Sequence, residues 1–198
     1  AEAGNVAAAS EALILWERRS RRIESLNLEA VVGMLDENVR TGDEAATVAL
    51  ARAYRVLRWR LPQARARHAA LVNEFGGQLG ARNFLREKLF DVYDPNNHGA
   101  SRRVGADLVQ EAEGEQYRHG IMGLRATEMT AFVYLLQREL SDLGYYQGAA
   151  SGRLTSSTLR ATLSFCDDQG IYDTCIHGPL TYPASSAIAV ALAQVKTQ

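Results

Sequence analysis

Two amphipathic segments joined by a short loop constrain the fold of this chain more than any other feature. Apolar residues recur at spacings of three and four between 132 and 143, which predicts one face of a helix. Gly144 follows, where a left-handed residue commonly ends a helix. Thr155 can accept a hydrogen bond from an amide two or three residues on, and so can cap a second helix that reaches Phe165. The apolar positions of the first helix are Phe132, Leu135, Leu136, Leu140 and Leu143.

A third helix is predicted near the C-terminus. It runs from about Ala184 to Val195, after the helix breakers Gly178, Pro179 and Pro183. Three short helices bury little apolar surface by themselves. We therefore expect this C-terminal part to pack against residues that precede it.

The N-terminal part of the chain is also predicted to be helical. Ser10 can cap a helix over 11–26. Further apolar periodicities predict helices over 28–39, 43–60, 68–75 and 79–93, with breaks near Thr41-Gly42, at Pro62 and at Gly76-Gly77. No segment alternates apolar and polar residues over the length that a strand needs. The predicted fold class is all-α.

The boundary between the two parts is predicted from composition. The segment 94–104, which reads DPNNHGASRRV, is the strongest loop signal, and 105–123 is polar and dotted with glycines. We therefore predict a helical domain over 1–104, a linker or hinge over 105–125, and a three-helix module over 126–198. A chain of 198 residues is long enough for a domain and a small module.

Charge and hydropathy exclude some partners. The formal net charge of -1 gives no electrostatic reason to expect a nucleic-acid partner. No apolar run approaches the roughly 20 residues that a membrane-spanning helix needs. The chain opens with AEAG, without an initiator Met or a basic segment, which is the pattern of a mature protein after removal of its signal peptide. We expect a periplasmic or otherwise exported protein.

The segment 135–165 carries a resemblance to a known family. It reads LLQRELSDLGYYQGAASGRLTSSTLRATLSF, and it resembles the peptidoglycan-binding domain type 1 family, a three-helix module of bacterial cell-wall proteins. The matching positions are Leu136, Gln137, Leu143, Gly144, Tyr145, Tyr146, Gly148, Gly152, Leu154, Thr158, Ala161 and Phe165. Three positions depart from the pattern: Ser151 stands for an aspartate, Thr155 for a glycine and Cys166 for a glutamine. The resemblance implies a helical module that binds the cell wall.

The resemblance also implies a binding surface, around the turn and the second helix. Tyrosine rings can stack on sugars, and an arginine can pair with a peptide carboxylate. At least one of the two adjacent tyrosines is expected to be part of the core. The residues predicted to contact peptidoglycan are Tyr145, Tyr146, Gln147, Ser151, Arg153 and Thr158.

Cys166 and Cys175 are the only cysteines of the chain. They can form a disulfide or remain two free thiols. The exported location that the resemblance implies favours the disulfide, because such bonds persist in oxidising compartments.

Three kinds of catalytic site can be compared with the residues of the chain. A zinc hydrolase is disfavoured, because the four histidines do not form an HExxH motif. A cysteine nucleophile at Cys175, next to His177, has the residue types without the required spacing. A catalytic glutamate in the helical region remains an alternative, with candidates at Glu17, Glu37 and Glu74. His98 with Asp94, Asn96 and Asn97 reads as a surface turn rather than a metal loop, so neither a metal nor a cofactor is expected.

These observations favour a non-catalytic cell-envelope protein. Its C-terminal module contacts peptidoglycan, and its helical region contacts another envelope protein. One alternative is a structural subunit of an envelope assembly that uses the module for protein–protein contacts. Another is a peptidoglycan hydrolase with its catalytic glutamate in the helical region.

Overall fold

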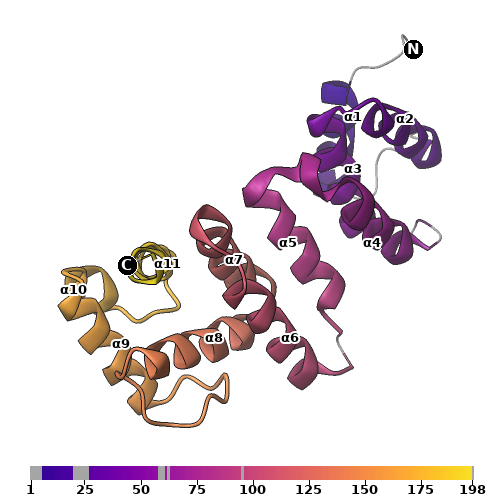
Figure 1. Ribbon diagram of the computed structural model, residues 1–198. Helices are drawn as coiled ribbons and strands as arrows, with labels where there is room; N and C mark the ends of the chain where they lie inside the picture. Colours follow the sequence, from indigo (N-terminus) through magenta and orange to yellow (C-terminus); the bar gives the residue numbers. More distant parts are fainter. Residues whose placement is uncertain (1–5, 20–26, 58–60, 62, 95, 198) are drawn as a thin grey trace. The chain divides into compact units, whose positions relative to one another are not determined.

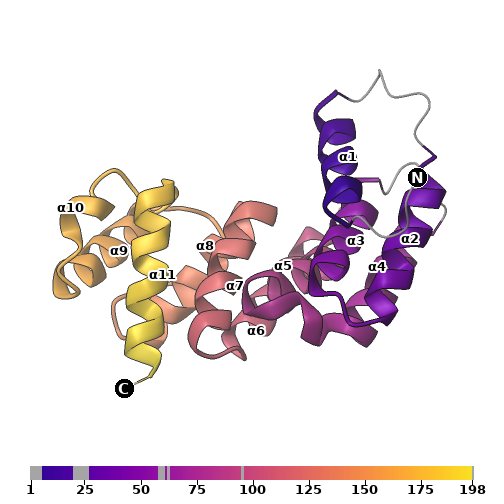
Figure 2. The ribbon, with the colours of Figure 1, turned by 90° about the horizontal axis from the view of Figure 1, so that it is seen from above.

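The structure, a computed structural model, describes residues 6–19, 27–57, 61, 63–94 and 96–197. The described residues form helices and connecting loops without a strand (Figures 1 and 2), which confirms the predicted all-α class. The chain divides into two compact units, Ala1–Asp91 and Val92–Gln198. Each unit is described by itself below.

The first unit is organised around one central helix. α3 (Glu44–Val56) packs against α1 (Val6–Arg19), α2 (Leu28–Arg40) and α4 (Ala64–Phe75). Many of its buried residues are alanines, whose small side chains allow neighbouring helices to approach. A short 3₁₀ helix, η1 (Gly76–Leu79), also packs on α3, and α5 (Gly80–Val92) completes the unit.

Most helices of this unit agree with the sequence-based predictions, and the first does not. α1 begins at Val6, so Ser10 lies inside it rather than at its N-cap. The reason is that the alanines before Ser10 are strong helix formers and extend the helix in the N-terminal direction. Residues 20–26 of the predicted helix lie outside the described part.

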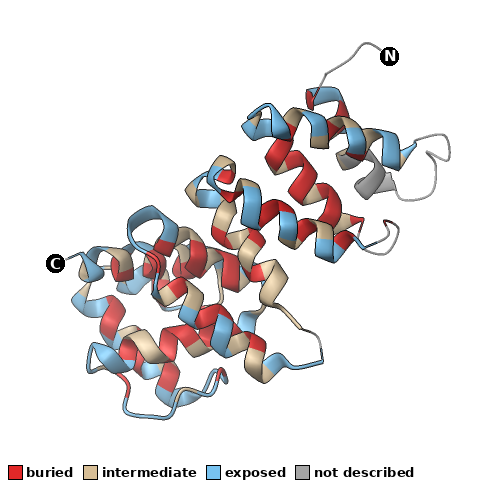
Figure 3. Cartoon of the chain, turned by 45° about the vertical axis from the view of Figure 1, so that its right-hand side comes forward, coloured by how far each residue is buried: buried red, intermediate tan, exposed pale blue. Residues whose placement is uncertain are grey.

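The second unit contains α6 (His98–Gln110), α7 (Gly114–Thr127), α8 (Met129–Asp142), α9 (Ser156–Asp168), α10 (Tyr172–Cys175) and α11 (Tyr182–Lys196). α7 packs against α6, α8 and α11, and α6 also packs against α8. α10 connects the remaining pair, since it contacts both α9 and α11. Buried and exposed residues alternate around most of these helices (Figure 3), as is typical of amphipathic helices in a helical bundle.

The predicted linker at 105–125 is wrong, because all of these residues except 111–113 are helical. They form the end of α6 and most of α7, and both helices belong to the second unit. Three glycines of the predicted linker are buried inside helices instead: Gly105, Gly120 and Gly123. At helix–helix contacts a missing side chain favours close packing, and this explains a glycine inside a helix. The loop predicted over 94–104 is shorter in the structure, because Asn97 caps α6 and the helix begins at His98.

The three helices predicted for the C-terminal module are present as α8, α9 and α11. Gly144 follows α8 with a φ of 84°, the left-handed conformation expected at this helix end. The hydroxyl of Thr155 accepts a hydrogen bond from the Thr158 amide and caps α9, as predicted. Thr181 caps α11 in the same way.

Within the described residues, no helix is both long enough and apolar enough to cross a membrane.

Candidate functional site

The loop between α8 and α9 is fixed by one buried side chain. Gln137 of α8 has no exposed surface. Its Oε1 accepts hydrogen bonds from the backbone N–H groups of Ser151 and Gly152, at 2.8 and 2.9 Å. Its Nε2 donates to the carbonyl oxygen of Arg153 and to Oγ1 of Thr158, both at 2.9 Å. An amide has two acceptor lone pairs and two donor protons, so these four bonds use its full capacity.

Gly152 has two reasons to be a glycine. Its φ of 75° lies in the left-handed region, which disfavours other residues. A Cβ atom here would also lie 2.6 Å from the carbonyl oxygen of Thr130 and 2.8 Å from Cδ of Arg102. The loop therefore lies directly against the start of α8, in one conformation.

Two of the predicted contact residues are not on the surface. Thr158 has no exposed area, because its hydroxyl faces Gln137 and Thr155 inside the unit. Tyr146 is only 6% exposed, which confirms that at least one of the adjacent tyrosines belongs to the core. Their burial removes Thr158 and Tyr146 from the candidate surface and gives them a structural role beneath the loop.

The other predicted residues do reach the surface. Gln147, Ser151 and Arg153 are exposed on the loop, and Tyr145 is half-buried at its start. The Tyr145 hydroxyl donates a 2.7 Å hydrogen bond to Asp168, and its ring packs edge-to-face on Phe165. The hydrogen bond to Asp168 raises the pKa of Tyr145. Tyr145 thus connects the loop to the end of α9.

A groove with a volume of about 540 Å³ lies beside this loop, and sequence reasoning did not anticipate it. Leu154 belongs both to the loop and to the groove wall. The other wall comes from the segment between α10 and α11. The lining residues are Leu154, Leu159, Thr162, Leu163, Cys175, Ile176, His177, Gly178, Pro179, Leu180 and Thr181.

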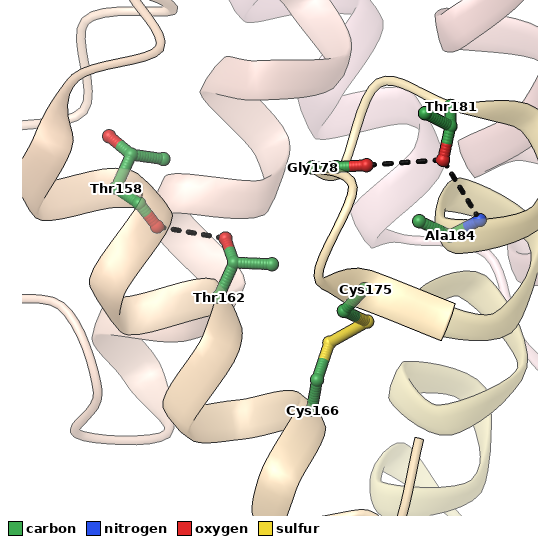
Figure 4. Close-up of a disulfide and its surroundings, with 7 residues drawn as sticks. All are labelled: Thr158, Thr162, Cys166, Cys175, Gly178, Thr181 and Ala184. Atoms are coloured by element: carbon green, nitrogen blue, oxygen red, sulfur yellow. Dashed lines mark hydrogen bonds between the residues drawn. A yellow bond between two sulfur atoms is a disulfide. The ribbon is translucent and has the colours of Figure 1, made fainter. Parts of the chain in front are cut away.

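The polar groups in the groove are mostly engaged within the protein. The Thr162 hydroxyl donates to the carbonyl oxygen of Thr158, and the Thr181 hydroxyl donates to that of Gly178 (Figure 4). His177 is the one histidine among the lining residues, and it is exposed. The groove therefore presents a largely apolar interior, which is typical of ligand sites.

The predicted cysteine pair forms a disulfide, and it joins the two walls of the groove. Cys166 lies at the end of α9 and Cys175 in α10, and both are fully buried (Figure 4). Because Cys175 also lines the groove, the bond fixes the distance between α9 and the opposite wall. The bond also removes Cys175 as a candidate nucleophile, since a disulfide sulfur carries no thiolate.

The described residues locate most of the groups named in the catalytic hypotheses. They contain no group of three or more His, Cys, Asp or Glu side chains arranged to hold a metal ion. At the 94–98 turn, Asp94 accepts from the amide of Asn96 and Asn97 accepts from that of Ala100, as in an ordinary capped turn. Of the candidate catalytic glutamates, Glu37 and Glu74 are exposed on helices, and the side chain of Glu17 lies outside the described residues.

No protein-family model matches this chain, and the searches of curated proteins and of solved structures also give no match.

Proposed function

We propose that the second unit is a binding module for the bacterial cell wall. The contact surface, here called the loop–groove surface, consists of Gln147, Ser151, Arg153 and the groove that begins at Leu154. The observation that carries the proposal is the Gln137 clamp, which holds an exposed polar loop in one conformation beside a concave apolar groove. A pre-organised loop loses little conformational freedom when it binds a ligand.

The chemistry of this surface suits peptidoglycan. The wall polymer offers sugar hydroxyls, amide groups, peptide carboxylates and small apolar side chains. Arg153 can form a charge-assisted hydrogen bond with a carboxylate, and Gln147 and Ser151 can bond to hydroxyls and amides. The groove can receive apolar parts of the stem peptide.

An exported location belongs to the same proposal. A disulfide is compatible with an oxidising compartment outside the cytoplasm, where the wall lies. In this proposal the module acts without catalysis, and the first unit contacts another envelope protein.

The test is a pull-down of the full chain with isolated peptidoglycan sacculi. Arg153→Ala should weaken binding roughly tenfold, because a charge-assisted hydrogen bond contributes about 1.5–3 kcal/mol. Arg103→Ala is the matched control, since Arg103 is an exposed arginine on α6 of the same unit. It should bind within about twofold of wild type.

Equal binding by wild type and Arg153→Ala would exclude this surface. Mass analysis of the supernatant adds a second readout. Release of wall fragments by the purified chain would contradict the non-catalytic proposal.

A second candidate function is supported by exposed apolar side chains, one in the groove and two on the helices that flank the segment 176–181. Ile176 is 53% exposed, Tyr182 65% and Tyr172 40%. Clustered exposed apolar side chains are typical of protein–protein interfaces. The module would then be a structural subunit of an envelope assembly, and the groove would receive an apolar segment of a partner protein.

The two candidates can be separated by paired variants. Ile176→Asp places a charge in the groove and should abolish co-purification with a partner at fixed stoichiometry. Arg153→Ala should instead reduce sacculus binding. Sacculus binding that Arg153→Ala weakens, without a partner at fixed stoichiometry, supports the wall module. A stable complex that Ile176→Asp disrupts and Arg153→Ala leaves intact supports the subunit.

A further inference from the structure

A fully buried histidine links two helices of the first unit. His68 on α4 has no exposed surface. Its Nδ1 lies 2.6 Å from Oδ1 of Asp91, and its Nε2 lies 3.1 Å from Oε2 of Glu87. Both carboxylates belong to α5, one turn apart. The ring therefore forms a bridge from α4 to two positions of the last helix of the unit.

For ionised carboxylates, this geometry determines the charge of the ring. An ionised carboxylate only accepts hydrogen bonds, so a nitrogen that faces one must carry a proton. Here both nitrogens face carboxylates, and both must donate. Neutral imidazole has one N–H, whereas the imidazolium cation has two. His68 is thus a buried cation between two anions.

Other charged groups keep the Glu87 carboxylate ionised. Arg55 of α3 donates to Glu87 at 3.2 Å, and Arg86 donates twice to the same carboxylate. On α4, Arg65 donates to the backbone carbonyl of Asp91. Burial alone raises the pKa of Glu87, but the hydrogen bond from His68 and the charges of Arg55 and Arg86 outweigh it and lower this pKa to about 2.

The proton on His68 is retained in spite of burial. Burial lowers the pKa of the imidazole, because a low-dielectric interior disfavours a charge. The hydrogen bonds with Asp91 and Glu87 act in the opposite direction and are stronger together, so the pKa of His68 lies above its ordinary value. The rings of Phe90 and His68 also pack edge-to-face, with their centroids 5.1 Å apart.

We propose that His68 is a proton-operated latch that holds α5 on α3 and α4, and that loss of its proton releases α5. The neutral ring keeps one N–H, so the other nitrogen directs a lone pair at an ionised oxygen. One attraction between α4 and α5 then becomes a repulsion. This latch is independent of any wall binding by the second unit.

The pH window follows from proton linkage. The closed state binds the proton more tightly than the open state, in which a histidine has an ordinary pKa of about 6.5. Below about pH 6.5 both states are protonated, so the opening equilibrium does not depend on pH. Above it, opening should increase about tenfold per pH unit until the pKa of the closed state is passed. Stability is therefore present at low pH and lost as the pH rises.

Two measurements on the full chain test the latch. Ring-nitrogen NMR can report the charge of His68 directly, because the chain has only 4 histidines. Hydrogen exchange of the α5 amides, corrected for its intrinsic pH dependence, reports opening. We expect two protonated ring nitrogens at pH 7, and α5 exchange that increases with the same midpoint as the His68 titration. A neutral His68 at pH 7, or α5 exchange without that midpoint, would overturn the proposal.

Two variants add a control. His68→Gln cannot become a cation, so it should remove the pH dependence of α5 exchange and leave α5 open at all pH values. His98→Gln changes an exposed histidine of the second unit and should leave the dependence unchanged. If His68→Gln fails to fold, the two wild-type measurements still decide the question.

Discussion

The two units stabilise their buried polar groups by opposite chemistry. In the first unit the buried polar side chains include His68 and Glu87, which are charged and depend on further charges from Arg55 and Arg86. In the second unit the central one is Gln137, a neutral amide bonded to backbone groups and to a hydroxyl. Amides and hydroxyls do not titrate in the physiological range, whereas histidine does.

This difference indicates different sensitivities. The first unit should respond to pH, because its helix contacts depend on a proton. The loop clamp of the second unit contains no titrating group and should be indifferent to pH. The second unit should respond to reductants, because Cys166 and Cys175 hold α9 to the opposite groove wall.

The largest expected effect is that of Glu87→Ala in the first unit. The change leaves the buried His68 cation with one carboxylate and removes the acceptor of Arg55 and Arg86. Breaking a buried charge network by removing one partner costs about 3–5 kcal/mol. Hydrogen exchange can resolve the two units and should show lost protection of α4 and α5, with α8 and α9 unaffected.

Glu37→Ala is the control for this prediction, since Glu37 is an exposed glutamate on α2 of the same unit. This substitution should change the free energy of unfolding by no more than about 0.5 kcal/mol. A similar loss of protection in both variants would mean that the charge network contributes nothing beyond an ordinary surface carboxylate.

Gln137→Leu should have the next largest effect, confined to the second unit. Leucine fills the space but leaves the amides of Ser151 and Gly152 without their acceptor. Each unsatisfied buried group costs about 1–3 kcal/mol, and the Ser151 amide is only partly buried, so a total of about 2–4 kcal/mol is expected. This loss should be the same at pH 6 and at pH 8, because no titrating group takes part. Exchange of the 151–158 amides measures it.

Gln194→Leu is the matched control, because Gln194 is exposed on α11. A pH-dependent loss in Gln137→Leu would break the proposed contrast between the units.

The contrast also explains which features could be predicted from the sequence. Helix periodicity, the Gly144 stop and the Thr155 cap are local signals, and all three agree with the structure. The buried position of Thr158 had a signal as well. Thr158, Ala161, Thr162, Phe165 and Cys166 lie at helical spacing on one buried face of α9. A polar residue on that face indicated a structural hydroxyl.

Features that depend on tertiary contacts could not be predicted in this way. The His68 bridge joins residues 19 and 23 positions apart, and no local pattern marks such a pairing. The groove depends on how the segment after Cys175 returns to α9. The role of the glycines in α6 and α7 also depends on tertiary contacts. A glycine that allows close helix packing and a glycine that breaks a helix look alike in sequence, so the sequence predicts a linker here.

The disulfide gives the third prediction. Replacing both cysteines, as Cys166→Ala with Cys175→Ala, removes a short covalent loop and should cost about 2–3 kcal/mol. Only the second unit should lose protection against exchange, and the α10 and groove amides should lose most. Treating wild type with a thiol reductant should reproduce this pattern, and the double variant should not respond to the reductant. A reductant effect on α4 and α5 would contradict the division of roles.

The smallest expected effect is that of Tyr145→Phe, and it separates stability from binding. The change removes only the hydroxyl that donates to Asp168, while the ring can keep its edge-to-face contact with Phe165. An exposed hydrogen bond of this kind contributes little, so the free energy of unfolding should change by less than about 0.5 kcal/mol. If sacculus binding falls at unchanged stability, the hydroxyl contacts the wall polymer. If binding is retained, Tyr145 only orients the loop, and recognition depends on Gln147, Ser151 and Arg153. The uncharged Gln137 clamp should keep these side chains exposed at every physiological pH, because an amide does not titrate there.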